Sequence, residues 1–177
     1  MKLIHLTARR FQFISADSIY NINLAENFYK ILKNDYLLVV ANKSPEQFQN
    51  MNVLNLNLRM RGKSALFYYW LPYLFYIFWL LFFIIFRKNN NRDVVFFSSD
   101  SILLAFLIFY RKLFRFKYRI CSDWHLLHNN WKDKYLAINS DYLITTSEKL
   151  KNLILKMSKI SPEKILTVYG GINLEKY

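Results

Sequence analysis

The sequence predicts an α/β fold, a Rossmann-like three-layer domain with a mostly parallel sheet of about seven strands and helices on both faces. Short apolar runs of strand length alternate with longer segments of helical periodicity along the whole chain. Most of these runs are continuously apolar, as in strands buried on both faces. The length of 177 residues suits one domain, which we take as 1–177.

The first part of the chain supplies three expected strands and one helix. KLIHLT (2–7) is an apolar first strand. Asp17-Ser18 offers a helix cap, and apolar residues at three-and-four spacing predict a helix over 18–33. DYLLVVA (35–41) is a second apolar strand, and the alternating run 53–58 is a third.

The second part repeats the alternation from 93 onward. DVVFFS (93–98) is a compact strand, and Ser99-Asp100-Ser101 supplies cap residues for a helix over 101–113. The remaining strands are apolar runs, and the remaining helices follow Ser or Asn residues. The expected strands are 116–122, 141–145 and 164–169, and the expected helices are 130–139 and 147–157.

The segment 64–86 contains no charged residue and is long enough for a membrane-spanning helix. A single crossing would separate 53–58 from 93–98, whereas one sheet requires the connection to return to the side that it left. We therefore expect a helix that lies on a membrane surface or is buried in protein, rather than a span. Because proline suits the first helical turn, we expect this helix to begin at Pro72 and end near Lys88.

The flanks of this segment are equally basic, unlike the asymmetric flanks of most spanning helices. Basic residues at both ends suit contact with an anionic membrane surface. Tyrosines at helical spacing would place hydroxyls along one membrane-facing side. The expected membrane-contacting residues are Tyr69, Tyr73, Tyr76, Arg87, Lys88 and Arg92.

The formal net charge of +13 points to an anionic partner, such as a membrane surface, a phosphorylated substrate or nucleic acid. The aromatic residues lie in apolar runs rather than among the basic ones, so we expect no nucleic-acid partner. Cys121 is the single cysteine, which favours a reducing compartment. The N-terminus does not resemble a signal peptide. These features predict a cytoplasmic chain, peripheral on the inner face of the cell membrane.

Ligands of such sheets bind beyond the carboxyl ends of the strands. His125, expected just after a strand, could donate a hydrogen bond to a sugar hydroxyl or a phosphate oxygen; the alternative is a surface histidine with a structural bond only. We found no phosphate-binding glycine loop, and His125 and His128 lack partners at zinc-site spacing, so we expect no metal. The expected substrate-binding residues lie near strand ends, although Ser99 and Asp100 also suit helix capping: Ser15, Asp17, Ser99, Asp100, Asp123, Gly170 and Gly171.

The stretch from Asp141 to the C-terminus resembles the end of the amino-terminal domain of GT-B glycosyltransferases, family 4 type. The shared residues follow the pattern Asp-x-(apolar)-(apolar)-Thr-x-Ser, then Glu-Lys, then Gly-Ile. They are Asp141, Thr145, Ser147, Leu150, Lys151, Glu163, Lys164, Gly171 and Ile172. The segment 120–125 is similar to the family's strand followed by Glu-x-His, with Asp123 in place of Glu. The chain departs from the family at two positions. It has Gly170 where the family has Asn, and it has Asn173 where the family has Asp.

The resemblance implies the acceptor-binding half of a membrane-associated glycosyltransferase. His125 would match the family's histidine near the donor sugar. The nucleotide-sugar would be bound mainly by a C-terminal domain absent from this chain, so the domain alone should be inactive. The reaction would retain configuration without a cofactor, and the acceptor would be a lipid-linked or cell-surface glycan. The alternative is a non-catalytic membrane-anchored binding or scaffold protein.

Overall fold

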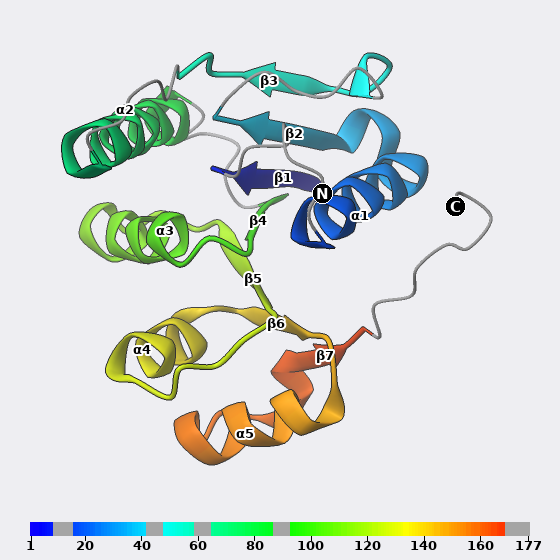
Figure 1. Cartoon of the computed structure of the whole chain (residues 1–177), viewed down its shortest axis with the longest axis vertical. Coiled ribbons are helices and arrows are strands. Elements are labelled where there is room, and N and C mark those ends of the chain that lie inside the picture. The colour runs from blue at the N-terminus through cyan, green and yellow to red at the C-terminus, as the bar shows by residue number, and fades with distance from the viewer. Residues whose placement is uncertain (9–15, 42–47, 59–64, 87–92, 169–177) are drawn as a thin grey trace.

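A parallel sheet of seven strands is the centre of the computed structural model, which describes residues 1–8, 16–41, 48–58, 65–86 and 93–168 (Figure 1). Within these ranges the side chains of 16–18, 65–70 and 72 are not described. The strands are β1 (Lys2–Thr7), β2 (Tyr36–Val40), β3 (Val53–Asn55), β4 (Val94–Ser98), β5 (Arg119–Trp124), β6 (Tyr142–Thr145) and β7 (Ile165–Thr167).

The helices connect successive strands. They are α1 (Ala16–Leu32), α2 (Ala65–Phe86), α3 (Ser101–Phe114), α4 (Trp131–Asn139) and α5 (Glu148–Ser158), with short 3-10 helices at Lys33–Asp35 and Pro162–Lys164. The predicted α/β class is confirmed, and most predicted elements lie within a few residues of the observed ones.

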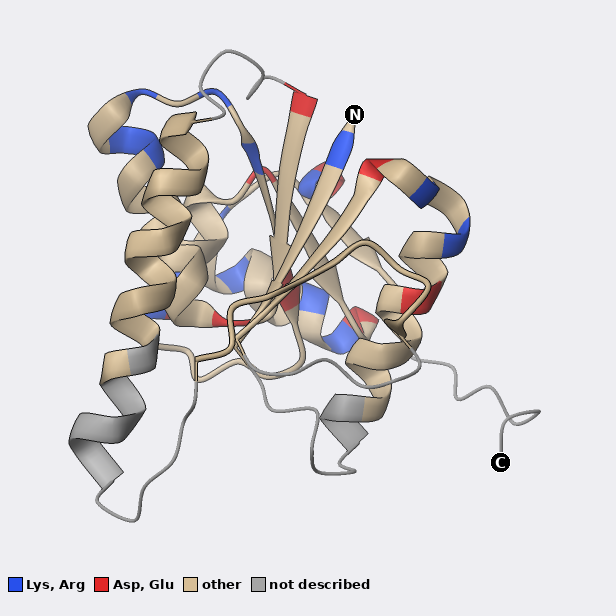
Figure 2. Cartoon of the chain, turned by 90° about the horizontal axis from the view of Figure 1, so that it is seen from above, with Lys and Arg blue, Asp and Glu red and all other residues tan. Residues whose placement is uncertain are grey.

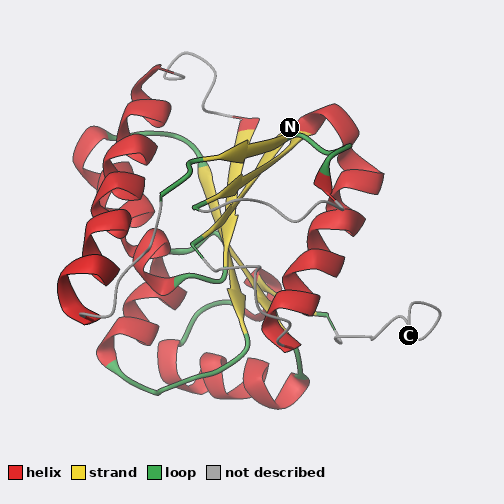
Figure 3. Cartoon of the chain, turned by 45° about the horizontal axis from the view of Figure 1, so that its top comes forward, coloured by secondary structure: helices red, strands yellow, loops and turns green. Residues whose placement is uncertain are grey.

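The strand order β3-β2-β1-β4-β5-β6-β7 decides which face each helix covers. Parallel crossovers are right-handed, so connections that run in opposite directions from β1 lie on opposite faces. Accordingly, α1 packs on one face, and α2, α3, α4 and α5 pack on the other. Figure 3 shows α1 across the sheet from α2 and α3. The order reverses between β1 and β4, the point at which ligands of such sheets usually bind.

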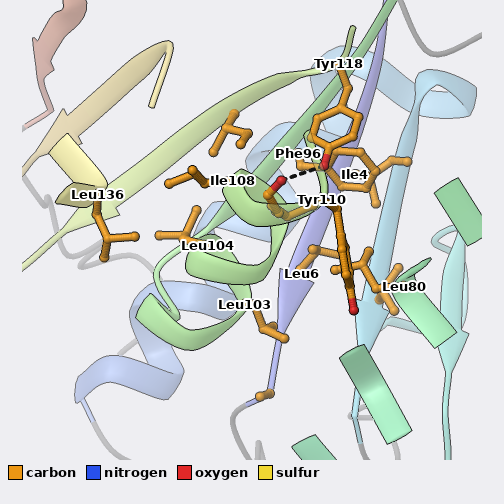
Figure 4. Packing of buried hydrophobic residues seen from close by; sticks show 14 of the residues in the cluster. Ile4, Leu6, Leu80, Phe96, Leu103, Leu104, Ile108, Tyr110, Tyr118 and Leu136 are labelled. Atoms are coloured by element: carbon orange, nitrogen blue, oxygen red, sulfur yellow. Dashed lines mark hydrogen bonds between the residues drawn. The ribbon is translucent and has the colours of Figure 1, made fainter. Parts of the chain in front are cut away.

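The main core lies between the sheet and α2, α3, α4 and α5. Ile4, Leu6 and Phe96 extend from the strands to meet Leu80 of α2 and Leu103 of α3 (Figure 4). Buried tyrosines in this core donate to backbone carbonyls: Tyr118 to Leu107 at 2.6 Å and Tyr110 to Ile77 at 3.2 Å. These hydrogen bonds compensate for the free-energy cost of burying the tyrosine hydroxyls away from water.

Two boundaries differ from the sequence prediction in a way that matters for the site. The fifth strand was expected to end at Ser122, but β5 continues to Trp124. Asp123 is therefore a strand residue that pairs with Ile144 of β6, rather than a loop residue beyond the strand. Hydrogen bonds to His125 and Tyr20 compensate for the burial of this carboxylate in the strand. In addition, β3 is shorter than the predicted 53–58.

The apolar segment forms one helix, which corrects the prediction of a break before Pro72. Helix α2 already begins at Ala65 and runs through Pro72 to Phe86. Proline removes one helical hydrogen bond, but packing of a helical face contributes more to stability than local preference. Tyr76, Leu80 and Ile84 supply that packing in the buried core. Strands β3 and β4 lie in one sheet, as the geometric prediction required.

The tyrosine side of α2 packs on the protein, which corrects the predicted membrane-facing orientation of Tyr73 and Tyr76. Both are buried. Tyr73 donates to Asp100 Oδ2 at 2.6 Å, and Tyr76 donates to the carbonyl of Val39 at 3.0 Å. The side chain of Tyr69 and residues Arg87, Lys88 and Arg92 lie outside the described residues. No helix within the described ranges meets the length and hydropathy required to cross a bilayer.

Candidate functional site

At the carboxyl end of β4, polar side chains build the start of α3. Asp100 caps the helix, because its Oδ1 accepts from the backbone amides of Ile102 at 2.9 Å and Leu103 at 3.2 Å. Its Oδ2 accepts from Tyr73, and its own amide donates to Ser98 Oγ at 3.0 Å. Asp100 therefore has the capping role that the sequence offered as the alternative to substrate binding.

At the end of β5, a buried carboxylate holds a histidine. The Asp123 side chain is fully buried, and its Oδ2 lies 2.9 Å from His125 Nε2. Its Oδ1 accepts from the Tyr20 hydroxyl of α1 at 3.4 Å. The Tyr20 and His125 rings meet edge to face, with centroids 4.4 Å apart. The imidazole is 28% exposed, so it joins buried groups to the surface of the site.

A cavity of about 240 Å³ opens beside this histidine, between the carboxyl ends of β4 and β5. Its lining is rich in hydroxyl, carboxylate and imidazole groups, which suit hydrogen bonding to a polar, hydroxyl-bearing ligand. The lining residues are Ser99, Ser101, Leu104, Asp123, Trp124, His125, Leu126, His128, Asp133 and Leu136.

The far wall of the cavity is held by local hydrogen bonds. Asp133 Oδ2 accepts from the backbone amide of His128 at 2.7 Å. Asn130 caps α4 by accepting from the amide of Asp133 at 3.0 Å. These bonds fix the loop between β5 and α4, which supplies Leu126 and His128 to the cavity lining.

The electrostatics of the site favour neutral donors around one carboxylate. Burial, together with the charge of Asp123, raises the pKa of Tyr20 well above its usual value, so the phenol keeps its proton. Burial likewise raises the pKa of Cys121 to about 12, so this thiol keeps its proton at neutral pH. Among the residues that the structure describes, no group of three or more His, Cys, Asp or Glu is placed to hold a metal.

The structure brings together Ser99, Asp123 and His125 of the predicted site residues. Ser15, Gly170, Gly171 and the Asp17 side chain lie outside what is described. Sequence reasoning missed Tyr20, which is 103 positions from Asp123 and follows no recognisable motif. It also missed Asp133, whose nearness to two histidines in sequence was the available signal.

Comparisons with known proteins match the fold alone. No protein-family model matches the chain, and no curated protein is significantly similar to it. Among solved structures, the lipopolysaccharide outer core galactosyltransferase WaaB in its apo form matches 97% of this chain, with a TM-score of 0.65 and 15% identity. Anabaena Alr3699/HepE in complex with UDP-glucose matches 100% of it, with a TM-score of 0.63 and 9% identity.

The chain covers 46% of either of these longer chains, less than half their length. Nearly the whole of this chain, with its seven-stranded parallel sheet, therefore matches one part of each larger protein. The fold is a seven-stranded, Rossmann-like α/β fold that matches a domain of GT-B glycosyltransferases.

Proposed function

We propose that the chain is the acceptor-binding half of a glycosyltransferase of the family 4 type, which transfers a sugar from a nucleotide-sugar to a glycan acceptor with retention. The observation that carries this proposal is the cavity at the carboxyl ends of β4 and β5, with His125 at its edge. A second half of the enzyme, in the same or another chain, would bind most of the nucleotide-sugar. The reaction would need no cofactor.

The arrangement of the cavity supports sugar binding. Sugars are recognised by hydrogen bonds to hydroxyl groups, and the lining offers Ser99, Ser101 and His125 as partners. Asp123 is buried behind the imidazole, so His125 is the partner that can meet a ligand. In this role His125 would contact the donor sugar, and Ser99 would lie beside it.

The proposal is tested by a glycosyl-transfer assay with UDP-glucose and lipid-linked glycan acceptors. The 177-residue chain should show no turnover alone and should gain it when joined to a donor-binding half. In the joined enzyme, His125→Ala should lower kcat/KM about 10- to 100-fold, because one substrate hydrogen bond is lost. The matched control is His128→Ala, which removes the other imidazole at the cavity and should cost less than threefold.

Turnover by the chain alone would show that the half-enzyme proposal is wrong. Full activity of His125→Ala in the joined enzyme would remove His125 from the site. UDP-galactose is the second donor in this assay, because one of the matched structures is a galactosyltransferase.

We further propose that this half works at the inner face of the cell membrane, through the outer face of α2. The side of α2 opposite Tyr76 exposes apolar side chains: Leu71, Leu74, Phe75, Phe78, Phe82, Ile85 and Phe86. Neighbouring α3 adds exposed Phe109, Leu113 and Phe114. We call these ten residues the α2–α3 patch. Soluble surfaces rarely gather so many large apolar side chains without a partner.

Charge beside the patch favours an anionic membrane as that partner. Lys and Arg residues gather at the carboxyl end of α3, beside α2, which has no charged residue (Figure 2). Apolar insertion combined with basic residues is how surface-bound helices hold anionic lipid. A lipid-linked acceptor would then reach the site along the same surface.

Vesicle sedimentation tests this surface. The chain should bind vesicles of equal phosphatidylglycerol and phosphatidylcholine, and should bind pure phosphatidylcholine at least tenfold more weakly. Replacing Phe78 and Phe82 with Asp should weaken binding to the anionic vesicles more than tenfold, since each buried Phe contributes about 1.5–3 kcal/mol. The control Ile31→Asp alters an exposed apolar residue on α1, across the sheet, and should leave binding within twofold. Equal binding by both variants would exclude the α2–α3 patch.

A further inference from the structure

The hydrogen bond between Asp123 and His125 determines which ring nitrogen of the histidine carries hydrogen. An ionised carboxylate only accepts hydrogen bonds, so the 2.9 Å contact to Oδ2 requires a hydrogen on Nε2. The carboxylate is fully buried, which makes loss of this bond costly. The imidazole at the cavity edge is therefore held as the Nε2–H form.

Tyr20 contacts the same pair, Asp123 and His125, from α1, which packs on the face of the sheet away from α3 and α4. Its hydroxyl donates to the second carboxylate oxygen, Oδ1, at 3.4 Å. Its ring lies edge to face against the imidazole, at an interplanar angle of 88°. Tyr20 thus contacts both members of the pair, one through its hydroxyl and the other through its ring.

We infer that Asp123 and Tyr20 are positioning residues that fix the tautomer and orientation of His125, rather than residues that touch the substrate. The tautomer and orientation of His125 are properties of the chain itself. Only the effect of Asp123 and Tyr20 on sugar transfer rests on the proposed function. It reassigns Asp123, which the sequence placed among substrate-binding residues. It also makes α1 part of the site, although no α1 side chain that the structure describes lines the cavity.

The groups that could disturb this arrangement by titrating are few in the described part of the chain. Cys121 lies two residues before Asp123 in β5, and its raised pKa keeps it neutral. His128 and Asp133 line the same cavity, and Asp133 is engaged with the amide of His128. From α1, the described side chain of Tyr20 contacts the pair, and it stays protonated.

The test is ¹⁵N NMR of the chain with labelled histidine at pH 7.5, where long-range ¹H–¹⁵N correlations distinguish the two tautomers. Wild-type His125 should show the Nε2–H pattern. Asp123→Asn should shift it to a mixture or to the Nδ1–H form, because an amide can donate as well as accept. The matched control Asp133→Asn changes a carboxylate on the far wall of the same cavity but keeps an oxygen acceptor for the amide of His128, so it should leave the His125 tautomer unchanged.

Tyr20→Phe keeps the ring contact and loses the donated hydrogen bond, so it should keep the tautomer and broaden the His125 signals. Tyr20→Ala should lose both contacts and mix the tautomers. If Asp123→Asn does not fold, which thermal unfolding will show, the tyrosine variants and the wild-type pattern decide the question. An Nδ1–H pattern in the wild type overturns the inference.

The joined enzyme separates this inference from the proposed function. Asp123→Asn should lower kcat/KM about tenfold, and adding it to His125→Ala should cost no more than His125→Ala alone, because both act through one group. Additive losses would show that Asp123 touches substrate itself. If the NMR result holds and no sugar transfer is found, the proposed function fails while the positioning role stands.

Discussion

When the pH is lowered from 7 to 5, the free energy of unfolding of the wild-type chain is expected to fall. The fall should be about 2 kcal/mol larger than that of a variant that lacks His5. Burial lowers the pKa of His5 to about 3 in the folded chain, whereas the unfolded chain titrates near 6.5. Between these values the unfolded state binds the proton and the folded state does not. Stability is therefore lost as pH falls below about 6.5, and the loss is complete near pH 3.

The structural cause is an imidazole enclosed by rings at the centre of β1. His5 is fully buried and lies against Phe28, Tyr36 and Phe97. Its Nδ1 is 2.9 Å from the Tyr36 hydroxyl, while its Nε2 has no hydrogen-bond partner among the described residues. A charged imidazole would need a partner at Nε2, so the neutral form is favoured here.

Urea unfolding at pH 7, 6 and 5 measures this effect. The variant with both His5→Phe and Tyr36→Phe is the reference, because it removes the buried hydroxyl together with its partner. The free energies of unfolding should diverge from those of the wild type as the pH falls. Parallel pH dependence of the two proteins would show that His5 does not titrate as an enclosed neutral group.

Leu80→Ala is expected to destabilise the chain by about 2–5 kcal/mol, and Phe82→Ala by less than about 0.5 kcal/mol. The two positions are two residues apart on α2, yet Leu80 is 0% exposed and Phe82 is 58% exposed. Leu80 packs in the main core, where truncation leaves a cavity (Figure 4). Phe82 belongs to the α2–α3 patch, where truncation removes little protein contact.

Chemical unfolding of both variants at pH 7, without lipid, checks this difference. The order of the two effects tests the orientation of α2 directly, because a rotation of the helix by half a turn would reverse it. A larger loss for Phe82→Ala than for Leu80→Ala would contradict both the core and the proposed membrane surface.

The strands were predictable because their apolar runs are short and bounded. Lys2–Thr7 matches the predicted first strand in full, since KLIHLT ends before polar residues. The orientation of α2 was not predictable, because almost every side chain of the segment is apolar and no stripe stands out. Tyrosine spacing predicts membrane contacts, whereas Tyr73 and Tyr76 donate to Asp100 and to the carbonyl of Val39, which come from distant segments.

For the candidate site, the sequence predicted the residues that lie close together in the segment 120–125. His125 and Asp123 were found by their place near a strand end, and the structure joins them. The sequence placed Asp123 just beyond the strand, whereas β5 continues through it, because register with β6 is a tertiary property. Tyr20 could not be found, since only the folded sheet brings α1 to the end of β5.

The pairing of β1 with β4 has a consequence for biosynthesis. Lys2 aligns with Val94, so 94 − 2 = 92 positions separate the two central strands. At ribosomal rates of about 5–20 residues per second, β1 waits roughly 5–20 s for this neighbour. During that interval the apolar segment 65–86 is synthesised before β4 and α3, with which it shares the main core, so the nascent chain should depend on chaperones until they emerge.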